Sequence, residues 1–248
     1  MCLGRQPGGG DHEDTIAKGV GDVQLSLCCY DALMNWMHDI AKANALISPY
    51  LRQTPVERSP GLEAHGNHVY LKLDNLQITG SFKVRGALHK LLSMSDEERA
   101  RGVIAASSGN HGAAVAYAAS VLGSKASVCV PTYASETKIA AIRGYGADVT
   151  LVGDDCVDTE VAARARAEAE GCVYVSPYND IDVVRGQGTL GVELAEQIAD
   201  LDAVFIAVGG GGLIGGVGAY LKGLNPHIEV VACSPERSPA LHACLEAQ

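Results

Sequence analysis

The chain has few aromatic residues, with one Trp and two Phe among 248 residues, and it has no cluster of Lys and Arg. Its 29 acidic residues outnumber its 19 basic ones, which leaves a formal net charge of −10. Surfaces that bind nucleic acid or an anionic membrane need basic charge, and those that bind single strands also use stacking aromatics. The sequence therefore predicts a small-molecule ligand and neither nucleic acid nor membrane as a partner. Any anionic ligand must be held by local backbone dipoles, because the overall field opposes it.

The chain also has no C-x-x-C pair and no stretch typical of a secretory signal, although it contains eight Cys. Cys129, Cys172 and Cys233 lie in apolar runs that are typical of buried strands. His65 and His68 form an H-x-x-H pair in a polar turn without a third ligand, so no metal site is predicted. Reduced thiols and the missing signal predict a cytoplasmic protein.

No charged residue interrupts positions 203–221, a stretch long enough to cross a bilayer. Four consecutive glycines in its middle favour a strand, a turn and a helix instead. Such alternation extends over most of the chain beyond residue 95, and it predicts right-handed crossovers and a doubly wound, mostly parallel α/β fold. Strands are expected at 68–73, 103–107, 126–130, 149–152, 173–176, 203–208 and 229–233, and helices at 32–50, 111–122, 136–145, 157–170, 189–199 and 213–224. Residues 1–30 show no sustained period and are expected to form a flexible extension.

Lys83 follows a polar turn and lies at the start of a further amphipathic helix. Ser81 is the expected N-cap, so Lys83 lies in the first turn, where the helix dipole disfavours a cation. This position raises the fraction of neutral, nucleophilic amine, which a covalent bond to an aldehyde requires. Lys83 is therefore the candidate covalent anchor, although a single lysine is more often an ordinary solvated side chain.

A second turn joins an apolar strand to a helix through Gly209-Gly210-Gly211-Gly212-Leu213. Glycine permits the positive φ and the close backbone approach that a phosphate site at a helix N-terminus requires. A flexible linker is the alternative, but a linker does not connect a buried strand to an apolar helix. The run also contains G-x-G-x-x-G ending at Gly215, with Glu236 at the distance of a ribose-binding acid, which leaves a nucleotide-dependent oxidoreductase as a weaker hypothesis.

A third turn, Ser107-Ser108-Gly109-Asn110-His111, also leads from a strand into a helix. Its hydroxyls, amide and free N–H groups suit a carboxylate or a ring oxygen. A simple N-cap would explain one serine but not this density of polar groups. A Ser–His catalytic dyad is disfavoured, because adjacent residues at a helix start seldom face each other and no orienting acid is evident.

Together, T-G-S-F-K-V-R-G-A, S-S-G-N-H-G and G-G-G-G-L-I-G-G resemble the serine/threonine dehydratase and serine racemase family of pyridoxal-phosphate enzymes. The resemblance covers about residues 43–246 and implies the two-domain tryptophan-synthase-β-like fold, known as fold type II. It implies a large cofactor-binding domain made of residues 31–101 and 180–248 and a small domain at 102–179. Members are often homodimers, which is the expectation for this chain.

The resemblance also implies roles for individual residues. Lys83 would bond the aldehyde of pyridoxal 5′-phosphate and move the Cα proton, with Phe82 packed beside the cofactor. Asn110 would bond the pyridoxal 3′-oxygen, and Gly209, Gly210, Gly211, Gly212 and Leu213 would hold the phosphate. Ser107, Ser108, Gly109, Asn110 and His111 would bind the substrate carboxylate.

The implied activity is β-elimination of L-threonine or L-serine to a 2-oxo acid and ammonia, that is, a dehydratase or ammonia-lyase. Serine racemase is the first alternative, because Ser108 resembles the second proton carrier of the racemases. Ser234 stands where those enzymes have a metal-binding carboxylate, which favours the dehydratase and again predicts no metal. Arg185 replaces a small residue of the family, and the resemblance predicts further strands and an S-G-G-N-like segment beyond residue 248. A large domain without them could be catalytically weakened, so a non-catalytic binding or partner protein is the second alternative.

Overall fold

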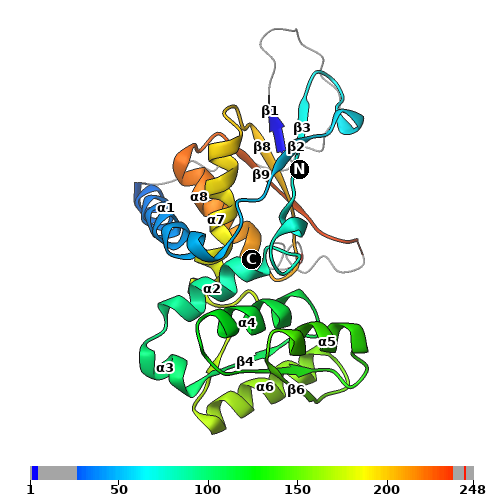
Figure 1. Cartoon of the computed structure of the whole chain (residues 1–248). Coiled ribbons are helices and arrows are strands. Elements are labelled where there is room, and N and C mark those ends of the chain that lie inside the picture. The colour runs from blue at the N-terminus through cyan, green and yellow to red at the C-terminus, as the bar shows by residue number, and fades with distance from the viewer. Residues whose placement is uncertain (1, 5–26, 237–242, 244–248) are drawn as a thin grey trace.

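The computed structural model describes residues 2–4, 27–236 and 243, which form two β-sheets with helices packed on them (Figure 1). The first sheet has five strands in the order β2-β3-β1-β8-β9, and the second has four in the order β6-β5-β4-β7. The strands are β1 (Cys2–Gly4), β2 (Val56–Arg58), β3 (His68–Lys72), β4 (Val103–Ala106), β5 (Ala126–Val130), β6 (Asp148–Leu151), β7 (Val173–Tyr174), β8 (Ala203–Ala207) and β9 (Glu229–Cys233).

Eight α-helices lie within the described residues and alternate with the later strands. They are α1 (Leu27–Ile47), α2 (Lys83–Ser93), α3 (Asp96–Arg101), α4 (Asn110–Val121), α5 (Glu136–Gly144), α6 (Cys156–Glu170), α7 (Ile181–Gln197) and α8 (Gly212–Leu224). Short 3₁₀ turns occur at Ser48–Tyr50, Pro60–Leu62 and Asp74–Leu76.

The four-stranded sheet is parallel throughout, as the alternation predicts. Helices α4 and α5 pack on one face around Val128 and Ile142, and α6 packs on the other face around Ile104 and Ala163. Apolar residues therefore cover both faces of this sheet, which explains why its strands read as continuous hydrophobic runs rather than alternating ones.

The five-stranded sheet is mixed. Strands β8 and β9 are parallel, but β1, β2 and β3 join antiparallel. Only nine residues separate β2 from β3, a connection too short for a parallel crossover, so antiparallel pairing is the outcome that geometry permits. Helices α7 and α8 cover this sheet through a core that includes Leu194, Ile206 and Leu221, and α1 packs against both helices.

Each sheet with the helices packed on it forms one layer. Helix α2 lies between these two layers, where it contacts both α7 and α4 (Figure 1). Its buried stripe of Val84, Ala87, Leu88 and Leu91 belongs to the core shared with α4. The first residue of α2 is Lys83, so the packing of this helix places Lys83 where the two layers meet.

Three sequence predictions differ from the structure. Within the predicted flexible extension, residues 2–4 form β1 and α1 already begins at Leu27, while residues 5–26 lie outside the described part of the chain. Helix α7 begins at Ile181, eight residues before the predicted start. The N-cap position of α2 is Phe82 and not Ser81, although the Ser81 hydroxyl accepts a hydrogen bond from the Lys83 N–H (3.4 Å).

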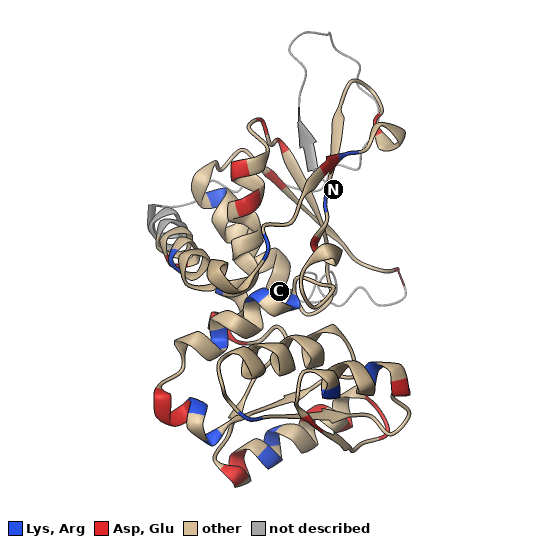
Figure 2. Ribbon diagram, viewed as in Figure 1, with Lys and Arg blue, Asp and Glu red and all other residues tan. Residues whose placement is uncertain are grey.

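The predicted domain boundaries at residues 102 and 179 stay a prediction; the strands of the four-stranded sheet all lie between residues 103 and 174. Figure 2 shows acidic and basic residues interspersed along the helices. Among the residues that the structure describes, no helix combines the length and the apolarity that a bilayer crossing requires.

Candidate active site

The amine of Lys83 is held at the junction of the two layers. Its Nζ donates a hydrogen bond to the Pro177 carbonyl (2.9 Å) and lies 5.1 Å from the centre of the Phe82 ring. Burial lowers the pKa of this amine, and among the described residues no carboxylate counteracts the shift. The predicted position at the start of the helix is confirmed, and burial is the cause that favours the neutral, nucleophilic amine.

The amine lines a cavity of about 570 Å³ together with Phe82 and the run Gly209 to Leu213. Gly211 has a φ of +86° and is the N-cap residue of α8, a conformation that L side chains rarely adopt. A Cβ placed on Gly210 would overlap the ring of Tyr178. The turn therefore requires glycine at both positions, and it leaves the first N–H groups of α8, which have no intrahelical partner, available to an anion.

A neighbouring cavity of about 550 Å³ lies beside the third motif. Its lining includes Ser107 and Ser108, which follow β4, and Glu160 of α6. The Ser107 hydroxyl accepts a hydrogen bond from the Gly109 N–H (3.1 Å) and so shapes the turn into α4. The predicted carboxylate-binding serines thus line a different cavity from Lys83, and Tyr178 lines both cavities.

His111 lies in the first turn of α4 with a buried side chain. Its Nε2–H donates to the Val175 carbonyl (2.9 Å), and Nδ1 has no hydrogen-bond partner. Burial lowers its pKa to about 4, so the imidazole is neutral at pH 7. The imidazole ring is therefore bonded within the protein interior. Of the groups of His111, the backbone N–H is the one that stays a predicted ligand of the carboxylate. Asn110 is the first residue of α4, and its contact with a cofactor oxygen stays a prediction.

Residues 175–178 bring the three motifs together, which the sequence did not predict. The carbonyl of Val175 binds His111, the carbonyl of Pro177 binds Lys83, and the ring of Tyr178 packs against Gly210. Any residue type can supply a backbone carbonyl acceptor, so the sequence does not reveal these contacts. The only signal in it is a Pro-Tyr pair in a strand-to-helix turn.

A buried ionic network fixes the other side of α2. The Arg85 guanidinium donates to both Asp74 oxygens (2.8 Å each) and to Glu193 of α7 (2.6 Å). Lys72 binds the second oxygen of Glu193, and the Thr54 hydroxyl donates to Asp74 (2.7 Å). Burial opposes charge on Arg85, but the two carboxylates outweigh it and raise its pKa. The network joins β3, α2 and α7, and it holds the helix that begins with Lys83.

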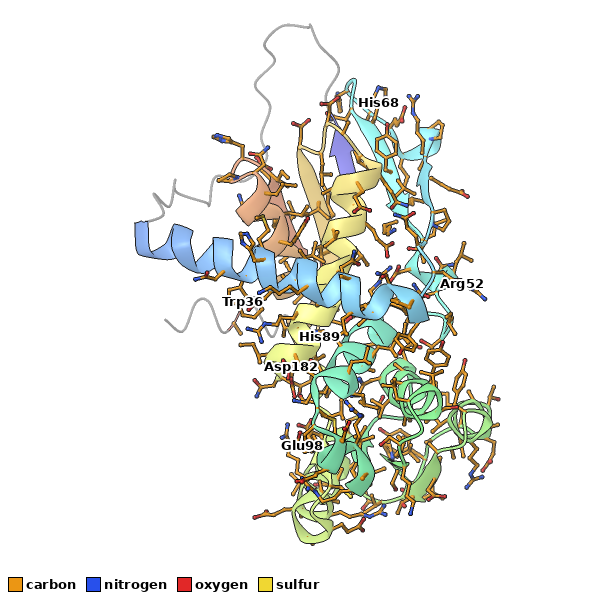
Figure 3. The ribbon with its side chains drawn as sticks, turned by 60° about the vertical axis from the view of Figure 1, so that its left-hand side comes forward. Trp36, Arg52, His68, His89, Glu98 and Asp182 are labelled. Carbon is orange, nitrogen blue, oxygen red and sulfur yellow. The ribbon has the colours of Figure 1, made fainter. Side chains whose placement is uncertain are left out.

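Arg185, which departs from the family pattern, points away from the site. It donates to Asp39 of α1 (2.7 Å), and its guanidinium lies 5.5 Å from the centre of the Trp36 ring. Figure 3 shows Trp36 on α1 beside the end of α7 that carries Asp182. Arg185 lines neither cavity, and its effect on activity stays a prediction.

Ser234 lines the cavity that contains Lys83. Among the described residues, no group of three or more His, Cys, Asp or Glu is placed to hold a metal ion. His68 lies 3.5 Å from the Glu63 carboxylate, which also accepts two hydrogen bonds from Arg58.

Known proteins resemble the chain in sequence and in fold. An L-threonine ammonia-lyase of Thermotoga maritima is 42% identical over 210 residues, which are 84% of this chain and 52% of that protein. A serine racemase from Dictyostelium discoideum superimposes with a TM-score of 0.80 at 40% identity, over 85% of this chain and 69% of that one. Threonine deaminase isoform 2 from Solanum lycopersicum superimposes with a TM-score of 0.83 at 32% identity, over 100% of this chain and 66% of that one.

The chain spans about half the length of the curated relatives it matches. The solved structures confirm the predicted α/β fold of the tryptophan-synthase-β type. The family of pyridoxal-phosphate dependent enzymes matches residues 47–248, and the chain belongs to that family.

Proposed function

We propose that this chain carries the cofactor-binding and catalytic residues of a pyridoxal-phosphate dependent ammonia-lyase that acts on L-threonine or L-serine. One observation carries the proposal: a half-buried lysine amine, which no carboxylate of the described residues pairs, lines the same cavity as a glycine turn at a helix N-terminus. These are the two ends that a cofactor with an aldehyde and a phosphate needs. The name of the relative from Thermotoga maritima supports the reaction class.

The described residues fit this cofactor. Gly209 to Leu213 would hold the phosphate through the N–H groups at the start of α8, where the helix dipole favours an anion. Lys83 would hold the aldehyde carbon, and Phe82 lies beside its amine. The Pro177 carbonyl orients the amine while it is free.

Bound pyridoxal phosphate supplies a ring that withdraws electrons from the substrate Cα. The amine of Lys83 would accept the Cα proton in its neutral form, which burial favours by lowering the pKa of the amine. The N–H groups at the start of α4 bind the substrate carboxylate and so fix the direction of the Cα–H bond.

The overall reaction conserves atoms. The substrate loses the Cα proton and the Cβ hydroxyl as one water molecule, and the resulting enamine takes up one water molecule as it releases ammonia. L-threonine thus gives 2-oxobutanoate, and L-serine gives pyruvate. The proposed reaction consumes no oxidant or reductant and therefore needs no redox nucleotide. The nucleotide-dependent oxidoreductase is not proposed for this site.

The names of the curated relatives support the lyase over a racemase. Racemisation needs a second proton carrier on the face of Cα opposite the lysine. Ser108, which lines the cavity next to the one that contains Lys83, stays the predicted carrier for that alternative.

Three finer assignments belong to the same proposal. Cys129, Cys156, Cys172 and Cys233 are free thiols, which supports a reducing compartment such as the cytoplasm. The family resemblance supports a homodimer, which light scattering on the purified protein tests. Strand membership supports a small domain at residues 102–179.

The test uses Lys83→Ala and the matched variant Lys42→Ala, since the Lys42 side chain is 80% exposed. Each protein is loaded with pyridoxal phosphate, its absorption spectrum is recorded, and 2-oxo acid is assayed with L-threonine and L-serine. The wild type and Lys42→Ala should show a covalent chromophore and turnover, and Lys83→Ala should show neither. Absence of product from the loaded wild type would contradict the lyase. A loaded wild type with chromophore but no product would support the non-catalytic alternative.

A further inference from the structure

Tyr178 lies on the boundary between the two cavities. It lines the cavity that contains Lys83 and the glycine turn, and it also lines the cavity that contains Ser107 and Ser108. No motif had marked this residue, and the proposed reaction gives it no role. Its side chain is 38% exposed, so the ring faces open space as well as protein.

The ring of Tyr178 is held at both ends. At its base it packs so closely on Gly210 that a Cβ there would overlap it, and its backbone lies against Gly212. At its tip the hydroxyl donates a hydrogen bond to Glu160 of α6 (3.3 Å). Glu160 is fixed in turn by two hydrogen bonds from Arg164 (2.7 and 3.0 Å). The ring is thus a fixed wall rather than a mobile surface side chain.

The proposed function, on which this inference rests, places a substrate across that boundary. Its amine would face Lys83, and its carboxylate would be bound by the turn at the start of α4. The third substituent on Cα is the side chain, and Tyr178 is the residue that lines both cavities. Beyond the ring, Val157, Val161 and Pro131 give the neighbouring cavity an apolar wall.

We propose that Tyr178 determines substrate specificity by blocking 3-hydroxy amino acids whose side chain is larger than that of threonine. With the ring in place, the side chain of serine or threonine fits on the Lys83 side of the wall. With the ring removed, the two cavities join, and an apolar side chain can extend into the space lined by Val157 and Val161.

The experiment compares kcat/KM for L-threonine and L-threo-3-phenylserine in the loaded protein. Tyr178→Ala should raise the phenylserine-to-threonine ratio at least about tenfold, since differences of one methylene in a pocket already change such ratios tenfold or more. Tyr178→Phe keeps the ring and should leave the ratio within about twofold. Tyr133→Ala is the matched control, because Tyr133 is 67% exposed and lines neither cavity. An unchanged ratio in an active Tyr178→Ala protein would overturn the proposal.

A binding measurement separates this inference from the proposed function. The loaded proteins are titrated calorimetrically with L-phenylalanine and L-alanine, which carry no 3-hydroxyl to eliminate. The two affinities measure the effect of the Tyr178 ring on binding without turnover. Tyr178→Ala should gain at least about tenfold in affinity for L-phenylalanine relative to L-alanine, even if the wild type produces no 2-oxo acid. If Tyr178→Ala does not fold, Tyr178→Leu replaces it, with a smaller gain expected. An equal effect on both amino acids, or no binding of either, would refute the assignment of Tyr178.

Discussion

Replacing Arg85 by Met should destabilise the protein by about 3–5 kcal/mol, the usual cost of removing one member of a buried ion pair. Arg85 is 1% exposed and donates three hydrogen bonds to the carboxylates of Asp74 and Glu193. After the change, Glu193 keeps its bond to Lys72, whereas Asp74 keeps only the hydroxyl of Thr54. The loss should therefore fall mainly on Asp74, a buried carboxylate left without a directly bonded counter-charge.

Urea unfolding of the cofactor-free protein, followed by circular dichroism, measures this loss. Arg58→Met is the matched control, since Arg58 makes a similar two-bond contact with Glu63 but its side chain is 51% exposed. Solvent screens exposed pairs, so the control should change the stability little. The double variant Arg85→Met, Asp74→Asn has no unpaired buried charge. Its loss of unfolding free energy should therefore be smaller than the sum of the losses of the two single variants. Equal effects at Arg85 and Arg58, or strictly additive losses, would refute the reasoning.

Two further predictions use the same unfolding assay, and a third uses fluorescence and turnover. The pKa of His111 is about 4 in the folded protein, below its ordinary value, so stability should fall by about 3 kcal/mol as the pH drops from about 6.5 to 4. His111→Asn should remove that part of the pH dependence, and an identical pH profile would contradict the assignment. Gly210→Ala should cost about 1–3 kcal/mol through overlap, whereas Gly209→Ala, with no atom within 4 Å of the added Cβ, should cost under about 0.5 kcal/mol; equal costs would count against the packing. Arg185→Ala should shift the fluorescence of Trp36, the only Trp, without changing turnover, and a loss of turnover would place Arg185 in the site after all.

Local signals in the sequence predicted most elements of the later part of the chain. The strands at 126–130 and 229–233 have the predicted bounds. The S-x-x-E pattern that begins at Ser95 forms a capping box, in which the Ser95 hydroxyl accepts from the Glu98 N–H and the Glu98 carboxylate accepts from the Ser95 N–H. Each of these signals depends on residues within a few positions of one another, which is why a single sequence reveals them.

The start of α7 could not be predicted in the same way. Gly186 and Gly188 have low helix propensity, so the stretch around them read as a loop. In the structure, a Cβ on Gly186 would overlap the backbone of Gly86 in α2, and one on Gly188 would crowd Ile40 of α1 and the Gly216 carbonyl of α8. Glycine there permits three helices to approach α7 closely. Tertiary packing outweighs propensity, and that packing joins residues far apart in the sequence.

The candidate site was predictable to a similar extent. The sequence predicted that Lys83 and the glycine turn share one ligand, and the structure places both in one cavity, while the cofactor contacts themselves stay predictions. The boundary at Tyr178 was missed, because it depends on how the turn after β7 meets the start of α8. The ionic network was also missed, since composition does not distinguish a buried arginine from an exposed one.

Lys83 and Arg85 show why that distinction matters for function. The two cations are two residues apart on α2, so they point about 200° apart around the helix and enter different surroundings. Burial lowers the pKa of Lys83, which meets only a carbonyl, whereas Arg85 meets two carboxylates that outweigh the same effect and keep it charged. The helix dipole acts on both residues and cannot account for the difference. The lowered pKa that favours a neutral amine at Lys83 therefore depends on the partners that the fold brings to each face of α2. The face with Arg85 holds the helix in place, and the face with Lys83 supplies the proposed base.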